Sequence, residues 1–106
     1  MSTTLIATFT ARAGEGPTVE RLITAYADVV RSEPGNERFE PFTDAEDDHR
    51  FIVVESYRDD DAFAAHLAAR AGADFNAALV GHIVEPASVL QFLRPAGTSG
   101  SLDARA

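Results

Sequence analysis

Residues 50–58 read Arg-Phe-Ile-Val-Val-Glu-Ser-Tyr-Arg, and the four large apolar residues at 51–54 favour a β-strand. Successive side chains of a strand point to opposite faces. The two faces here carry Phe51, Val53, Glu55 and Tyr57 on one side, and Ile52 and Val54 on the other. Because both faces are mainly apolar, this strand must be covered on both sides.

The segments around this strand alternate between strand and helix patterns. The expected strands are 4–12, 36–43, 50–58 and 88–94, and the expected helices are 17–31 and 62–69. An acidic loop at 44–49 joins the second and third strands as a hairpin. The order strand, helix, strand, strand, helix, strand predicts a ferredoxin-like α+β fold, with a four-stranded antiparallel sheet and the helices on one face.

Local signals set the expected ends of the helices. Pro17 suits a first helical position, and Pro34-Gly35 stops the first helix. The acidic residues 59–61 lie where a helix N-terminus is stabilised by side-chain acceptors and negative charge. Gly72 is expected to interrupt the second helix, and Asp74 to cap a further short one. We therefore predict a single domain over 1–94 and a flexible Gly- and Ser-rich tail over 95–106.

The last strand, like the third, is apolar on both faces, with Val89 and Leu93 opposed to Leu90 and Phe92. Helices on one side of the sheet leave the other side uncovered. A second copy of the chain is the natural cover for such a face. We therefore expect a homodimer with its sheets packed face to face.

Composition excludes several classes of function. The 106 residues contain no Cys, and the nine basic residues are all Arg, which excludes thiolate, Schiff-base and P-loop chemistry. The formal net charge of −8 disfavours nucleic acid and anionic membranes as partners. No signal peptide and no apolar span is evident, so we expect a cytoplasmic protein.

Three residues are candidates for chemistry. Helical spacing places His66 on a stripe with Phe63 and Leu67 that is expected to face the sheet. Glu55 and Tyr57 share the strand face that this helix covers. A buried carboxylate needs a partner, so a purely structural hydrogen bond and a catalytic role both stay open. The acidic hairpin loop lacks the glycine and the carboxylate spacing of a calcium loop, so no metal site is predicted.

Residues 33–39 (Glu-Pro-Gly-Asn-Glu-Arg-Phe), 50–57 and 61–67 (Asp-Ala-Phe-Ala-Ala-His-Leu) resemble the antibiotic biosynthesis monooxygenase (ABM) domain, including its quinol monooxygenase branch. The likeness covers residues 5–94. It implies a dimeric α+β barrel that oxidises phenolic or quinol-like substrates with O₂ and without a metal, flavin or other cofactor.

The resemblance also implies roles for individual residues. Glu55 or His66 would be the base that removes a phenolic proton, and Tyr57 would orient the substrate or stack on it. The implied apolar substrate pocket would be lined by Phe39, Phe51, Val53, Phe63, Leu67 and Phe75.

The chain departs from the family pattern at several polar positions. Phe42 and Asn36 replace a His and a Cys of quinol-type relatives, and Val53 and Phe63 replace an Asn and a Tyr of polyketide-tailoring relatives. A haem-ligating His has no counterpart near Phe75, which disfavours haem. Three functions stay open: an O₂-dependent monooxygenase of a small aromatic, quinol or polyketide-like molecule; a non-catalytic dimeric barrel that binds a small apolar ligand; and an isomerase or cyclase in which Glu55 and His66 shuttle a proton.

Overall fold

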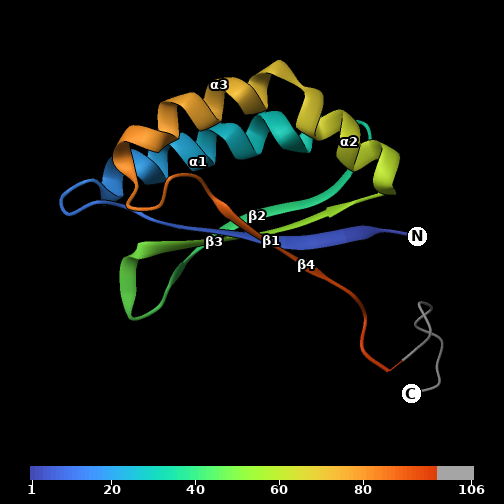
Figure 1. Cartoon of the computed structure of the whole chain (residues 1–106), viewed down its shortest axis with the longest axis horizontal. Coiled ribbons are helices and arrows are strands. Elements are labelled where there is room, and N and C mark those ends of the chain that lie inside the picture. Colours follow the sequence, from blue (N-terminus) through green and yellow to red (C-terminus); the bar gives the residue numbers. More distant parts are fainter. Residues whose placement is uncertain (98–106) are drawn as a thin grey trace.

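The computed structural model describes residues 1–97, and Figure 1 shows its helices gathered on one side of the sheet. The elements in chain order are β1 (Thr3–Thr10), α1 (Gly16–Arg31), β2 (Asn36–Asp44), β3 (Asp47–Tyr57), α2 (Asp60–Ala68), α3 (Arg70–Leu79), the 3₁₀ turn η1 (Val80–His82) and β4 (Val89–Leu93). The four strands pair antiparallel in the order β2-β3-β1-β4. The predicted ferredoxin-like α+β fold is confirmed.

The core lies between the sheet and the helices. In the central strand β1, Leu5, Ala7 and Phe9 are buried and pair with Glu55, Val53 and Phe51 of β3. Helix α1 presents a buried stripe at helical spacing that consists of Val19, Ile23, Ala27 and Val30. The alternation read from the sequence therefore fixes which face of β1 and β3 meets the helices.

The opposite face of the sheet is open in the single chain. Its apolar side chains are Ile6, Phe42, Ile52, Val54, Val89 and Leu93, all half-buried or exposed. Every residue of β4 is exposed, including Leu90 and Phe92, which the pairing with β1 places on the helix-covered face. The helices therefore cover the β4 edge only in part, with Phe63 of α2 packed edge-on against Phe92.

The junction between α2 and α3 differs from the sequence prediction. The Asp59 side chain caps α2 by accepting a hydrogen bond from the Ala62 N–H at 2.8 Å, as expected for this acidic segment. The helix breaks at Ala69, which has an extended backbone, and not at Gly72. The predicted cap at Asp74 is also wrong, because this residue lies inside α3.

Packing explains why glycine occupies position 72. A Cβ there would lie 3.0 Å from the Tyr26 hydroxyl of α1, so the glycine permits close approach of α3 and α1 instead of ending a helix. Figure 1 shows these two helices side by side.

The predictions of a C-terminal tail and of no membrane-spanning segment can be compared with the structure as follows. Most of the predicted tail, residues 98–106, lies outside the described residues. Within residues 1–97, no helix is long and apolar enough to cross a membrane.

Candidate functional site

A cavity of about 100 Å³ lies between the inner face of the sheet and the helices. Five of the six residues expected to bind substrate line it, namely Phe39, Val53, Phe63, Leu67 and Phe75. The sixth, Phe51, stacks on Phe9 with ring centroids 5.6 Å apart and lies behind that ring, outside the cavity. Leu67 lines the cavity although it is 61% exposed, so α2 presents it at a mouth and not wholly to the sheet.

Glu55 and Tyr57 form a hydrogen-bonded pair on the buried face of β3. The Tyr57 hydroxyl donates to Glu55 Oε1 at 2.7 Å. Glu55 lines the cavity, whereas Tyr57 lies behind it with its ring against Phe63 and His66. Tyr57 therefore does not line the cavity itself. It affects the cavity through its hydrogen bond to the Glu55 carboxyl group.

Burial controls the ionisation of this pair. It raises the pKa of Glu55 above its ordinary value, and the hydrogen bond from Tyr57 and the neighbouring His66 only partly oppose it. Burial and the adjacent Glu55 also raise the pKa of the Tyr57 phenol, so this hydroxyl remains a donor at neutral pH. A carboxyl whose pKa is raised toward neutrality is a stronger base when it is ionised.

His66 lies between two carboxyl groups. Its Nδ1 is 2.9 Å from Glu33 Oε1, and its Nε2 is 4.0 Å from Glu55 Oε1, longer than a hydrogen bond. The carboxylate of Glu33 therefore selects the tautomer with the proton on Nδ1, which leaves the Nε2 lone pair available on the cavity side. The structure thus brings together the predicted Glu55, Tyr57 and His66 and adds Glu33.

A glycine brings Glu33 within reach of His66. Glu33 lies in the turn between α1 and β2, two residues before Gly35. A Cβ on Gly35 would lie 2.3 Å from the Cβ of Ala62, in the first turn of α2. The glycine therefore lets α2 pack directly on this turn, and His66 follows Ala62 by one helical turn on the same face.

Tyr26 is a second residue of the site that the sequence analysis did not select. It lines the cavity from α1 and stacks on Phe75 of α3 with centroids 4.3 Å apart. Burial, together with the carboxylates of Glu33 and Glu55, raises the pKa of Tyr26 to about 12, so it remains a neutral phenol. A tyrosine on the core face of an amphipathic helix was the available signal, because its hydroxyl needs a polar environment.

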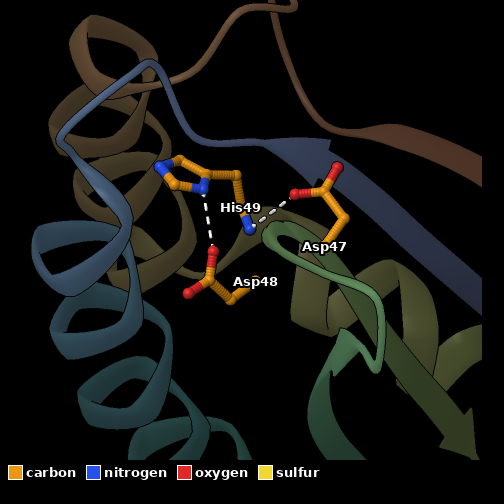
Figure 2. Close-up of side chains that lie close together, drawn as sticks. All are labelled: Asp47, Asp48 and His49. Carbon is orange, nitrogen blue, oxygen red and sulfur yellow. Dashed lines mark hydrogen bonds and ion pairs between the residues drawn. The ribbon is translucent and has the colours of Figure 1, made fainter.

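Two other features, a groove beside β4 and the acidic hairpin, are weaker candidates for a functional site. A larger groove of about 630 Å³ runs between the N-terminus and β4, but it is open and lacks a buried titratable group among its described residues. At the start of β3, Asp47 Oδ1 accepts the His49 backbone N–H and Asp48 Oδ1 lies 2.9 Å from His49 Nδ1, as Figure 2 shows. These side chains bind one another at the surface. The predicted hairpin is confirmed, but its loop is shorter than the expected 44–49, because β2 ends at Asp44 and β3 begins at Asp47.

The fold and the cavity define a ferredoxin-like α+β domain in which one imidazole, held near two carboxyl groups, forms part of an apolar wall. Such a site can move a proton to or from a small apolar molecule. The sequence profile of the antibiotic biosynthesis monooxygenase family matches residues 2–78, and the chain belongs to this family. The resemblance noted from the sequence is confirmed.

Solved structures agree with this fold. PA3566 from Pseudomonas aeruginosa is 27% identical with a TM-score of 0.82, covering 91% of this chain and 95% of that one. Rv0793 from Mycobacterium tuberculosis is 19% identical with a TM-score of 0.83, covering 93% and 99%. SnoaB, a cofactor-independent oxygenase from Streptomyces nogalater, is 20% identical with a TM-score of 0.79, covering 94% and 98%. None of the curated proteins matches the chain.

Proposed function

We propose that this protein is a cofactor-independent monooxygenase that oxidises a small aromatic, quinol or polyketide-like molecule with O₂. The observation that carries the proposal is the position of His66. Its ring lines an apolar cavity, with Nε2 on the side of Glu55, which also lines this cavity. The other ring nitrogen, Nδ1, lies within hydrogen-bond distance of Glu33. Family membership and the structural similarity to a cofactor-independent oxygenase support the same reaction class.

In the first step, His66 Nε2 accepts the proton of a phenolic hydroxyl, and the ionised Glu55 beside it stabilises the imidazolium that forms. Tyr57 fixes the Glu55 carboxylate through its hydrogen bond. The phenolate that results is electron-rich and donates electrons to O₂ in a cavity from which most water is excluded.

The overall reaction balances without an external reductant when the substrate carries a CH₂ group conjugated to the phenolate. Two C–H bonds break and a C=O bond forms, so the carbon loses four electrons. One oxygen atom of O₂ enters the carbonyl group and the other leaves as water, so O₂ gains these four electrons. The protein has to supply only a base, a binding site and a dry environment.

The cavity limits how the substrate enters. At about 100 Å³ it is smaller than a cavity of roughly 150 Å³ that binds benzene, so we expect an aromatic substrate to displace side chains. Leu67 and Leu90 line the cavity and are 61% and 43% exposed, so they mark the mouth. We place the substrate ring between this mouth and His66, where it would separate the stacked rings of Tyr26 and Phe75.

We further propose that the protein is a cytoplasmic homodimer in which the open face of the sheet packs on that of a second copy. The exposed apolar side chains on the open face of β4 support this arrangement, because a monomer would leave Val89 54% exposed and Leu93 43% exposed. Light scattering at micromolar concentration is expected to give a dimer. A monomer would contradict the assignment.

Oxygen uptake with a panel of quinols and anthrones tests the activity. We expect consumption above background, and a loss of about 10²- to 10⁴-fold in kcat for His66→Ala, with a smaller loss for Glu55→Gln. His49→Ala is the matched control because its imidazole lies on the hairpin, and it is expected to keep full activity.

Three results would contradict the proposed monooxygenase or favour one of the other two functions. Absence of uptake across the panel, or unchanged turnover in His66→Ala and Glu55→Gln, contradicts the monooxygenase. Turnover that persists without O₂ indicates the isomerase or cyclase. Ligands that raise the Tm without any product indicate the non-catalytic binding protein.

A further inference from the structure

A second hollow touches the site from outside. It has a volume of about 300 Å³ and lies between the turn that follows α1 and the helix α2. Glu33, Gly35, Arg58, Asp61 and His66 are among its lining residues, and we call it the outer cleft. Within residues 1–97, His66 alone lines both the outer cleft and the inner cavity.

The two carboxyl groups near His66 belong to different compartments. Glu55 lines the inner cavity and its side chain is 6% exposed, whereas Glu33 lines the outer cleft and is 21% exposed. The two imidazole nitrogens follow the same division, with Nε2 toward Glu55 and Nδ1 toward Glu33. The imidazole of His66 therefore lies between the inner cavity and the outer cleft, with Nε2 on the cavity side and Nδ1 on the cleft side.

We propose that the outer cleft is the proton outlet of the site and that Glu33 carries the proton from His66 Nδ1 to solvent; this rests on the proposed function for its role in turnover. The substrate O–H bond breaks as the Nε2–H bond forms, giving an imidazolium. The Nδ1–H bond then breaks as the proton moves to Glu33 Oε1, 2.9 Å away, which leaves a neutral imidazole with its proton on Nε2. Water in the cleft then takes the proton from Glu33. After the oxidation, the product phenolate takes the Nε2 proton while Glu33 returns a proton from solvent to Nδ1, which restores the starting tautomer and leaves no net proton released.

This route lets one imidazole lose and regain a proton while a substrate is bound. Once the substrate covers Nε2, a proton on that nitrogen cannot return to solvent through the inner cavity. The far nitrogen offers an exit that does not require the substrate to leave. Glu33 is thus a positioning residue that also relays the proton, and its charge environment in the cleft includes Arg58 and Asp61.

Two substitutions separate relay from orientation. In Glu33→Gln the amide oxygen still accepts the Nδ1–H hydrogen bond, so orientation is preserved but the proton cannot be taken. Glu33→Ala loses both roles and leaves space beside an open cleft, where added formate can replace the missing carboxylate. Asp61→Asn is the matched control because it removes an equal charge from the same cleft, and the 2.9 Å contact with His66 belongs to Glu33.

The first readout is solvent exchange of the His66 ring N–H measured by NMR, which needs no turnover. We expect exchange to slow about tenfold or more in Glu33→Gln, to recover in Glu33→Ala with formate, and to stay unchanged in Asp61→Asn. Unchanged exchange in Glu33→Gln would overturn the outlet even if the enzyme turns over.

The second readout is steady-state kinetics with a substrate that the oxygen-uptake panel identifies. Glu33→Gln is expected to lower kcat about tenfold or more with KM unchanged, and formate to restore kcat in Glu33→Ala. Normal kcat in Glu33→Gln would reduce Glu33 to an orienting group and refute the relay. Slowed exchange without any turnover would leave the outlet standing and refute only the proposed oxygenase.

Discussion

Replacing Gly35 by alanine tests how the fold assembles the site. The new Cβ would lie 2.3 Å from the Cβ of Ala62 and 3.3 Å from its Cα, whereas carbon atoms pack best at about 3.5–4.0 Å. Neither atom can move without its backbone, so α2 must shift by about 1 Å or more. Overpacking of this kind costs about 1–3 kcal/mol.

Thermal and urea unfolding followed by circular dichroism measure this cost. We expect the Tm of Gly35→Ala to fall by about 4–8 °C for each kcal/mol lost. Gly81→Ala is the matched control, because nothing lies within 4 Å of a Cβ at that position. Without a clash, this substitution is expected to be neutral or to stabilise by up to about 1 kcal/mol.

A compensating variant shows whether the contact with Ala62 causes the loss. In the double variant Gly35→Ala with Ala62→Gly, the 2.3 Å clash disappears and only the 3.3 Å contact with the Cα of residue 62 remains, so the combined cost should be smaller than the sum of the single costs. The NMR signals of the His66 ring should shift in Gly35→Ala and return in the double variant. A Gly35→Ala protein with wild-type stability and unchanged His66 signals would refute the reasoning.

Three further outcomes follow from the structure. The raised pKa of Glu55 means that its ionisation costs stability as the pH rises from the ordinary carboxyl value of 4.5 to the raised value. Glu55→Gln avoids this cost and its amide can still accept from Tyr57, so its gain in Tm is expected to grow through this window and then level off. A pH series of melting curves with a constant difference would contradict this. Asp59→Ala should lower the Tm at neutral pH and lower it less in acid. The hydrogen bond from the Ala62 N–H holds the pKa of Asp59 below its ordinary value, so protonation of Asp59 weakens this cap. Equal losses of Tm at both pH values would argue against the cap. Leu79→Ala should cost about 2–5 kcal/mol in urea unfolding, since the side chain is 1% exposed; a cost below about 1 kcal/mol would show that the site is loosely packed.

The sequence predicts the fold well where the signal is local. The alternation in β1 and β3 identifies the buried face because the period of a strand is two, whatever the strand pairs with. The break between α2 and α3 is different. Ala69 carries no helix-breaking chemistry, and Gly72 has a packing role against Tyr26 that depends on a helix far away in the sequence. Local rules therefore selected the wrong residue.

The candidate site was only partly predictable for the same reason. Glu55 and His66 stand out because polar side chains at apolar positions break a periodic pattern. Glu33 breaks no pattern, because it follows the polar residues Arg31 and Ser32 directly before Pro34. Its contact with His66 spans 33 residues and exists only because Gly35 admits α2. Pairing across such a distance requires the fold.

Ionisation of Glu55 lowers the stability of the fold but supports the proposed activity. The residue is 5% exposed, and ionising its carboxyl in the core costs free energy that glutamine would avoid while keeping the hydrogen bond from Tyr57. A residue chosen only for packing would therefore not be a glutamate here. Its retention is understandable if the charge is needed when His66 becomes an imidazolium, because only an ionised partner stabilises that state. A Glu55→Gln protein that is more stable and less active would be the signature of this trade between stability and chemistry.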